Sequence, residues 1–529
     1  MAVMKFPWLL AIITIVAAAS AVLITFPAEA DGVDSEIETF TIEGVEYEVL
    51  FDHYVGMSMV DFALKGHLDI PNTVEYEGTT YTVTTIGTLA IPMGSKLTSV
   101  TIPANVTKIE SGAIVGGELE SIEVDYENPI YESVDGVLYA NGGTTLVSSP
   151  AKKTSVAVST KVTEIEQRAF YSGSLESIWI YGNVSIIQSE TFANCRHLRE
   201  FNMTMDGVNT MPSSVLIIED SAFSNCESLQ NISLNNVRTI GMYAFSNTGL
   251  ETINITEAVV NVADGAFIGC QNLRYFESEN EFYPAEEGVL YEKRSILSLK
   301  CYPAGKTDES LTIPAEADTI SPWAFSGCSH LKNVKILDQA EVSYAAFSEC
   351  SSLEYVYMWD GVLYIDAMAF SGCSALKGFQ ANGLVGMGML AFSETGLESV
   401  VFPATLRVVM DAVFMGCINM VSAEFGENLE YLGGYAFYHT QLSEVTITSD
   451  KVELAPGCMN VGGYDTPKAH TTLTIQKGVE VPADIANEDT ELVIIRIGDR
   501  PYPVENLPVV GLCIAILVGI IYYFRRVRT

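Results

Sequence analysis

The sequence predicts a repeat solenoid rich in β-structure, in which short parallel strands of successive units form a sheet along one side. Three observations predict this fold. An apolar residue recurs at a nearly constant spacing of 22 or 23 residues, and the apolar positions around it keep the same pattern in each unit. Each unit is also too short to bury its apolar stripe alone, so it must stack on its neighbours.

The reference residue of each unit is the aromatic or aliphatic member of a pair that resembles Ala-Phe. Thirteen such residues align: Ile91, Ile114, Phe170, Phe192, Phe223, Phe245, Phe267, Phe325, Phe347, Phe370, Phe392, Phe414 and Phe437. Five or six positions later a leucine or methionine opens a segment such as Leu331-x-x-Val334-x-Ile336. Its alternation is typical of a strand with one buried face. We therefore expect about 13 repeats, each with one strand.

The first 90 residues precede the regular array. Residues 1–30 are typical of a signal peptide: Lys5 is followed by an apolar run, Phe6 to Phe26, and by the small-x-small sequence Ala28-Glu29-Ala30. An uncleaved anchor is the alternative. Residues 31–90, which contain TIEGVEYEVL and VEYEGTTYTVTTIG, are expected to form an N-terminal cap and the first strands.

The array itself is expected over residues 91–450, with two inserts at about 125–160 and 277–312. The inserts share Gly-Val-Leu-Tyr followed by Pro-Ala-x-Lys-Thr, and we predict duplicated β-hairpins that project from the array. The second contains Gly305-Lys306-Thr307. A phosphate-binding loop needs a further glycine five residues earlier, where Lys300 stands, so we exclude this function.

The C-terminal region is predicted to cap the array and then to anchor it. Residues 451–500 form the cap and 501–506 a linker. Residues 507–524 are apolar and uncharged, which predicts a transmembrane helix. The basic tail, 525–529, belongs in the cytoplasm by the positive-inside rule.

The same boundary also resembles a sortase signal. Leu507-Pro508-Val509-Val510-Gly511 is similar to LPxTG, but Val510 replaces the threonine and no spacer separates it from the apolar run. Covalent attachment to a cell wall is therefore the alternative to a membrane anchor.

The recurring pattern I-x-x-x-AF-x-x-C-x-x-L-x-x-V-x-I resembles the BspA-like class of leucine-rich repeat. The resemblance covers roughly residues 37–480. It implies a leucine-rich repeat solenoid displayed on a cell surface, and adhesion to components of the extracellular matrix or of other cells.

Seven cysteines lie three residues after a reference phenylalanine: Cys195, Cys226, Cys270, Cys328, Cys350, Cys373 and Cys417. Thr248, Thr395 and Thr440 occupy this position in other units. A catalytic or metal-binding thiol would not be exchanged for threonine, so we predict a small buried packing residue. A disulfide between neighbouring repeats, Cys328–Cys350 or Cys350–Cys373, is the alternative.

Other chemistry is not indicated. The six histidines are scattered singly, without HExxH or Cys-x-x-Cys, so we predict no metal site and no cofactor. No G-x-S-x-G elbow occurs, and we predict that the protein is not an enzyme. The net charge of −38 disfavours nucleic acid as a partner.

Five Asn-x-Ser/Thr triplets are candidate glycosylation acceptors. They are Asn105, Asn183, Asn202, Asn231 and Asn254. The last three are predicted on successive strands, with their side chains facing away from the core.

The segment Leu353 to Trp359 predicts a ligand-binding face. Its alternation buries Val356 and Met358 and turns three aromatic side chains outward. The expected ligand-binding residues are Tyr355, Tyr357 and Trp359, with Asn333, Lys335 and Gln380 on neighbouring strands. The alternative is that the rings pack against a hairpin insert or against each other.

From these features we expect a non-catalytic binding or adhesion protein of the cell surface, anchored in the membrane, whose partner is an extracellular protein or glycan. A structural envelope or coat protein with an acidic, cation-binding surface is the first alternative. A surface hydrolase that uses paired carboxylates is the second.

Overall fold

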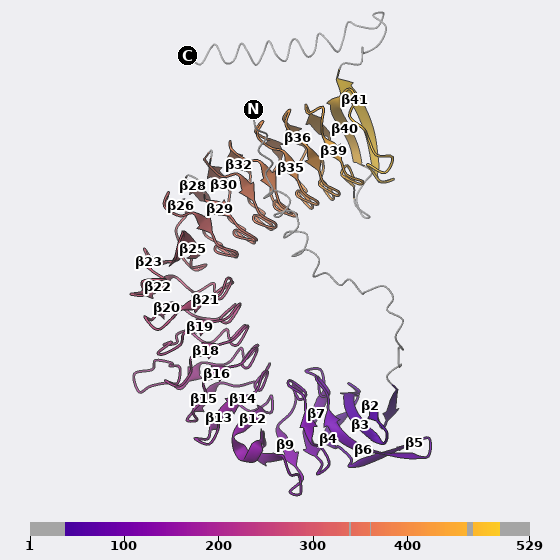
Figure 1. Cartoon of the computed structure of the whole chain (residues 1–529), viewed down its shortest axis with the longest axis vertical. Helices are drawn as coiled ribbons and strands as arrows, with labels where there is room; N and C mark the ends of the chain where they lie inside the picture. Colours follow the sequence, from indigo (N-terminus) through magenta and orange to yellow (C-terminus); the bar gives the residue numbers. More distant parts are fainter. Residues whose placement is uncertain (1–37, 338–339, 360, 463–468, 498–529) are drawn as a thin grey trace, which may run out of the picture.

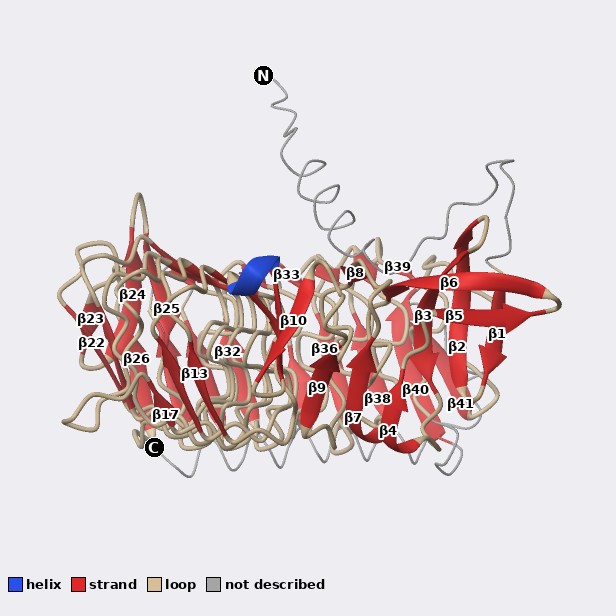
Figure 2. Ribbon diagram, turned by 90° about the horizontal axis from the view of Figure 1, so that it is seen from below, coloured by secondary structure: helices blue, strands red, loops and turns tan. Residues whose placement is uncertain are grey.

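The computed structural model describes residues 38–337, 340–359, 361–462 and 469–497. In this part of the chain, coils of β-structure stack into an open arc, with an N-terminal cap at one end and the last two strands at the other (Figure 1). The strands run across the arc, and the one helix of the described residues is a 3-10 turn, η1 (Asn141–Gly143) (Figure 2). The predicted solenoid with parallel, stacked strands is confirmed.

The predicted signal peptide, linker, transmembrane segment and basic tail lie outside the described residues. Among the residues that are described, no helix combines the length and apolarity needed to span a bilayer.

The first side of each coil is a strand of the L-x-x-V-x-I segment, and these strands form the long-strand ladder. They pair in parallel within five successive sheets, so that Val334, Val356 and Phe379 are neighbours. Its strands are β4 (Lys65–Asp69), β7 (Lys96–Ile102), β9 (Ser121–Val124), β13 (Ser155–Val158), β15 (Ser177–Ile180), β17 (Glu200–Phe201), β20 (Thr252–Ile255), β22 (Tyr275–Ser278), β26 (Ser310–Ile313), β28 (Asn333–Ile336), β30 (Tyr355–Met358), β32 (Gly378–Ala381), β34 (Ser399–Val401), β36 (Ser422–Phe425), β38 (Glu444–Ile447), β40 (Ala469–Gln476) and β41 (Thr490–Ile497).

The second side is a strand of two residues that ends on the apolar residue five positions before the reference phenylalanine. These strands form the short-strand ladder, in which Ile320 pairs with Val342. Its strands are β8 (Lys108–Ile109), β14 (Glu164–Ile165), β16 (Ile186–Ile187), β18 (Ile217–Ile218), β19 (Thr239–Ile240), β21 (Asn261–Val262), β27 (Thr319–Ile320), β29 (Glu341–Val342), β31 (Tyr364–Ile365), β33 (Gly386–Met387), β35 (Val408–Val409), β37 (Tyr431–Leu432) and β39 (Glu453–Leu454).

The third side is the turn that carries the reference phenylalanine. In the Phe223 unit the turn has two residues with left-handed φ, Ser221 (57°) and Asn225 (59°). The amides of Phe223 and Asn225 each donate to a carbonyl of the next repeat at 2.8 Å. Consecutive phenylalanine rings stack with centroids 4.5 to 5.9 Å apart. The turn therefore contributes both a backbone ladder and an aromatic column.

A mixed, mostly antiparallel sheet closes the N-terminal end of the core. Phe40 stacks on Tyr76 with ring centroids 4.3 Å apart and nearly parallel planes. Its strands are β1 (Thr39–Ile42), β2 (Val45–Phe51), β3 (Tyr54–Val60), β5 (Thr73–Tyr76) and β6 (Thr79–Ile86), and β6 pairs with β8 of the short-strand ladder.

The two inserts differ from the projecting hairpins that we predicted. Each does hold a hairpin, but its second strand is buried between coils, and the insert then continues as one further coil of the solenoid. The insert strands are β10 (Tyr131–Val134), β11 (Val137–Ala140), β12 (Thr145–Ser148), β23 (Ala285–Glu286), β24 (Val289–Lys293) and β25 (Leu297–Cys301). In the extra coil of the second insert, Tyr302 takes the phenylalanine position and stacks on Phe325 at 5.0 Å.

The inserts divide the buried side chains into three clusters. In β11, Leu138 packs into the N-terminal cluster, whereas Val137 and Tyr139 pack into the middle one. In β24, Leu290 belongs to the middle cluster, and Val289 belongs to the C-terminal one. Because both faces of these strands are buried, each hairpin is a partition within the core.

Candidate functional site

The candidate binding face is centred on β30. Val356 and Met358 are buried in the core, so the alternation of the strand turns Tyr355 and Tyr357 to solvent with 39% and 40% of their surface exposed. Trp359 follows the strand and is 63% exposed. Three large aromatic side chains thus lie uncovered on consecutive outward positions.

The strand register brings the predicted polar residues to the same face. Asn333 and Gly378 lie beside Tyr355, and Lys335 and Gln380 lie beside Tyr357. The ring of Tyr355 leans over Gly378, where a Cβ atom would lie 3.7 Å from it. All six residues that the sequence singled out are therefore neighbours. We call them, together with Gly378, the aromatic face.

The alternative expectation for the rings was that they pack against a hairpin or against each other. In the described part of the chain, the hairpins lie elsewhere, between coils, and these three rings form no ring stack and no cation–π contact. Tyrosine and tryptophan lose little conformational entropy when they are immobilised, so exposed rings of this kind are efficient contact residues.

A row of alternating charges borders the aromatic face, one position before each strand. Lys332 pairs with Glu309, and Lys377 pairs with Glu354, both with nitrogen–oxygen distances of 2.8 Å. The hydrogen bond from Lys377 lowers the pKa of Glu354. Because these charges neutralise one another, the cation that remains on the face is Lys335, which has no carboxylate within salt-bridge distance among the described residues.

The repeat cysteines are buried thiols, and all nine cysteines in the described residues are free. Six of them donate a hydrogen bond from Sγ to a phenylalanine carbonyl in the preceding repeat, at 3.0 to 3.3 Å. The pairs are Cys195 with Phe170, Cys226 with Phe192, Cys270 with Phe245, Cys350 with Phe325, Cys373 with Phe347 and Cys417 with Phe392. Burial raises the pKa of Cys270 to about 11, so it stays protonated and is a poor nucleophile.

The candidate glycosylation sites are less uniform than predicted. Asn105, Asn183 and Asn254 are exposed, but Asn202 is half-buried and its side-chain oxygen accepts from the Ile180 amide at 2.6 Å. The oxygen of Asn231 likewise accepts from the Asn209 amide at 2.9 Å.

Only Asn254 of the three predicted strand positions lies within a strand, β20. Asn202 directly follows β17, and Asn231 lies outside any strand. The reason is the longer unit before Phe223, whose extra residues, 203–210, form a loop that leaves a single bridge, Thr210 to Ser233, in place of a strand pair.

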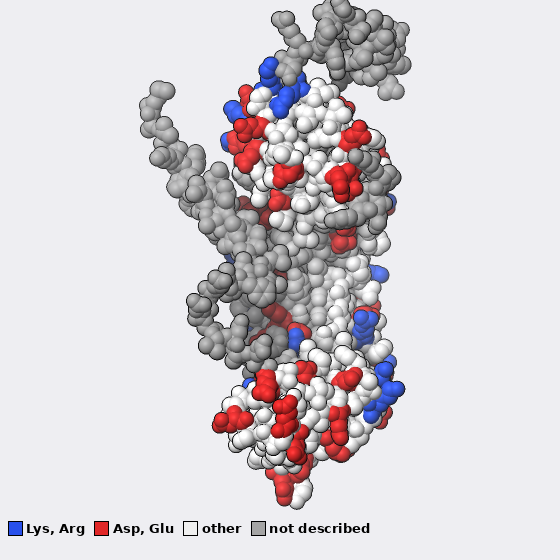
Figure 3. Space-filling model, turned by 90° about the vertical axis from the view of Figure 1, so that its right-hand side faces the viewer, with Lys and Arg blue, Asp and Glu red and all other residues white. Residues whose placement is uncertain are grey.

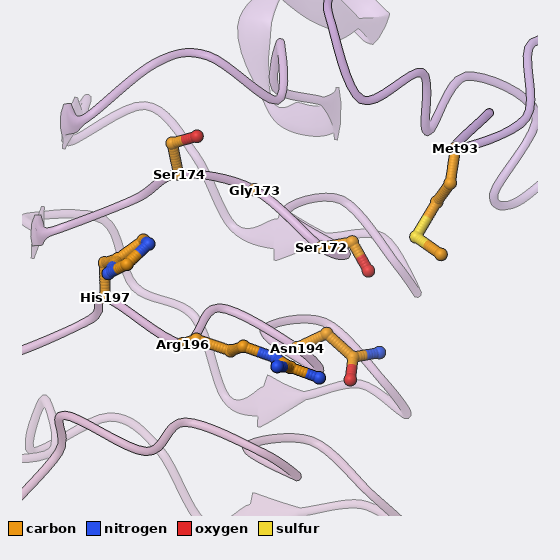
Figure 4. Close-up of a pocket in the computed structure, with 7 residues that line it drawn as sticks. All are labelled: Met93, Ser172, Gly173, Ser174, Asn194, Arg196 and His197. Carbon is orange, nitrogen blue, oxygen red and sulfur yellow. The ribbon is translucent and has the colours of Figure 1, made fainter. Parts of the chain in front are cut away.

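A pocket lies among turns of the N-terminal half of the array (Figure 4). Its volume is about 330 Å³, and its lining residues are Met93, Ser172, Gly173, Ser174, Asn194, Arg196 and His197, none of which is acidic. Arg196 and Asn194 extend toward the side where Met93 lies. Sequence reasoning missed this pocket because Met93 is far from the other lining residues in the chain.

The described residues hold no group of three or more histidines, cysteines or acidic residues that could bind a metal ion. Acidic side chains are instead dispersed, and many lie on the two arms of the arc (Figure 3).

The sequence matches the family described as a BspA type leucine rich repeat region, with six copies. The matched residues are 72–133, 147–213, 208–305, 298–420 and 386–461. No curated protein matches the chain.

Several solved structures resemble the fold. A leucine-rich cell surface protein from Faecalibacterium prausnitzii A2-165 is 23% identical, with a TM-score of 0.47 over 78% of this chain and 96% of that one. A leucine-rich repeat protein from Eubacterium ventriosum is 20% identical, with a TM-score of 0.46 over 81% and 96%. The pneumococcal vaccine antigen PcpA is 17% identical, with a TM-score of 0.41 over 87% and 99%.

Proposed function

The chain belongs to the BspA-type leucine-rich repeat family, and we propose that it is a non-catalytic binding protein of the cell surface. Its partner would be an extracellular protein or glycan, held by the aromatic face. The observation that carries the proposal is the exposed trio of Tyr355 and Tyr357 on β30 and Trp359 directly after it.

The geometry of the face supports this role. The rings project from a parallel ladder that fixes their backbone, so little order has to be gained on binding. The amide groups of Asn333 and Gln380 and the ammonium group of Lys335 flank them, and can form directional hydrogen bonds with a ligand. Aromatic anchors with a polar surround are typical of binding hot spots.

The proposal also includes membrane attachment through residues 507–524, with the array outside the cell. The alternative of a coat protein predicts lateral self-association into arrays without a defined ligand site. Its cation-binding component has no clustered site among the described residues.

Binding to a panel of glycans and matrix proteins tests the proposal. We expect that replacing Tyr355, Tyr357 and Trp359 by alanine weakens a saturable interaction by about 30-fold or more, since even one hot-spot truncation costs about 2 kcal/mol or more. The control replaces three exposed tyrosines elsewhere, Tyr126, Tyr181 and Tyr435, which are 91%, 62% and 53% exposed. Equal affinity of the two triple variants would show that the aromatic face is not the site.

A further inference from the structure

We propose that the C-terminal strand β41 pairs with β41 of a second copy, which joins two arrays in an antiparallel, two-fold symmetric dimer. Strand β41 is the last strand of the long-strand ladder. It pairs with β40 along all eight of its residues, from Thr490 to Ile497. In the described part of the chain no strand lies on its other edge. An unpaired edge of this length is a template for another strand.

Several exposed side chains of β41 are apolar, as is typical of a strand that is covered by another element. Glu491, Val493, Ile495 and Ile497 form its outward row, and the three apolar members are 53%, 51% and 39% exposed. Glu491 pairs with His470 of the neighbouring strand at 3.2 Å. On the inward row, Ile494 is 39% exposed at the open end of the core. The last coil of a solenoid needs a polar outer surface if it is to face water, and from Val493 onward the outward row of β41 is apolar.

The chain's own C-terminal segment does not suit the edge. Pro501 and Pro503 follow β41 closely in sequence, and proline has no amide hydrogen to donate to a ladder. A returning strand would therefore lack donors where it had to pair.

The other end of the array does not suit the edge either. The long-strand ladder begins there with β4, whose outward side chains are Lys65, His67 and Asp69. Pairing β4 with β41 would place these charged groups beside Val493 and Ile495. Head-to-tail growth is thus mismatched, whereas pairing of β41 with itself sets its central apolar residues, Val493 and Ile495, against one another.

Two-fold pairing also produces a closed assembly that cannot grow further. When the axis is perpendicular to the sheet, directly opposed residues point to the same side, so that Val493 faces Ile495 of the second copy if the axis passes Ile494. An isologous contact of this kind uses up both edges and stops at two copies. It therefore differs from the lateral growth of a coat.

The contact is small, since one pair of strands buries less than the roughly 1,600 Å² of a standard interface. We therefore expect a weak dimer in dilute solution, and a populated one where copies are confined to a surface. The inference does not depend on the aromatic face. If that face binds a ligand, dimerisation would double its valency.

Cysteine scanning of the full-length protein tests the pairing. Single cysteines are placed at each position from 490 to 497 in a Cys513→Ser background, and the purified protein is treated with a mild oxidant. We expect one maximum of crosslinked dimer within the strand, at the position nearest the axis. The control, Thr474→Cys, lies on the same outward face one strand further in, and is expected not to crosslink. Absence of crosslinking throughout β41, or equal crosslinking at position 474, would overturn the proposal.

Edge variants give an independent readout. We expect Val493→Lys with Ile495→Lys to abolish the dimer, measured by light scattering at increasing protein concentration, without a change in melting temperature. Val401→Lys, at a valine that is 75% exposed on β34, is the matched control and should leave the dimer intact. If the double-lysine variant still dimerises, the strand does not pair with a second copy. The same conclusion holds if the unsubstituted protein is monomeric and the double-lysine substitution only reduces its binding to lipid vesicles.

Discussion

At the scale of single residues, the cysteine position illustrates why two different side chains serve one purpose. The thiol of Cys350 donates to the Phe325 carbonyl of the preceding repeat. The hydroxyl of Thr395 donates instead to the Phe392 carbonyl of its own repeat, at 2.9 Å. Both side chains are buried, so each supplies a donor to a carbonyl that water cannot reach. The position therefore requires a small side chain that can donate a hydrogen bond.

We predict that Cys350→Ala destabilises the protein by about 1 kcal/mol, because the Phe325 carbonyl loses the thiol and keeps only the Cys328 amide, at 3.0 Å. Cys350→Ser should cost less, since serine keeps a donor; threonine is a poorer test because the units with threonine are one residue shorter at this point. Urea unfolding of the three proteins measures the difference. If the alanine and serine variants lose the same free energy of unfolding, the volume of the side chain at position 350 matters and its hydrogen bond does not.

At the scale of elements, one asparagine in each insert connects the insert to the array through four hydrogen bonds. The amide nitrogen of Asn280 donates to the carbonyls of Thr256 and Val259, both at 2.8 Å, and its oxygen accepts from the amides of Phe282 and Tyr283. In the first insert, Asn128 donates to the carbonyls of Pro103 and Val106 and accepts from two amides in the same way. Its four bonds are 2.8 to 3.0 Å long.

A tyrosine in each insert completes the connection. The hydroxyl of Tyr283 accepts from the Val262 amide at 3.1 Å, and that of Tyr131 accepts from the Ile109 amide at 2.8 Å. These amides end the short-strand ladder where the hairpin interrupts it. The tyrosine thus replaces the carbonyl that the next repeat would have supplied.

We predict that Asn280→Ala destabilises the protein by about 3 kcal/mol, since it leaves buried backbone groups unpaired. Asn382→Ala, at an exposed asparagine, should change stability by less than about 0.5 kcal/mol. Thermal unfolding compares the two. Faster hydrogen exchange at Phe282 and Tyr283 in Asn280→Ala would locate the defect in the insert, and a loss no larger than that of the control would refute the role of Asn280 in connecting the insert to the array.

At the scale of the whole molecule, the division of the core into three clusters is expected to determine which parts of the array unfold together. Stability in a repeat array is close to a sum over neighbouring units. The inserts place buried strands between the three clusters, so contacts across them are fewer than within a cluster. The clusters are therefore expected to open separately.

We predict that Phe223→Ala, in the middle cluster, costs about 3–5 kcal/mol there and leaves the C-terminal cluster unaffected. Hydrogen exchange at low denaturant should show faster exchange of amides near Phe245 but not near Phe370. Faster exchange along the whole array would indicate a single cooperative unit.

The regular repeats were accessible from sequence because each contact there joins equivalent residues of adjacent units. The period of 22 or 23 residues was enough to place Tyr355 beside Asn333 and to turn its ring outward. The same reasoning was wrong at Asn231, because the loop of the longer preceding unit displaces the strand pair. It also missed the pocket at Met93, which joins turns that are not adjacent in sequence.

The sequence by itself determined the solenoid, its repeat boundaries and the outward direction of the aromatic face, because periodic burial is a local property of each unit. Only the tertiary structure decided that the hairpins partition the core and that the cysteines donate to carbonyls of the preceding repeat. It also decided that β41 ends the ladder with a largely apolar edge, which pairs with no other strand of the described residues. These features depend on which residue of another coil contacts a given residue. Where an insert or a chain end interrupts the repeat, the periodic pattern no longer predicts that contact.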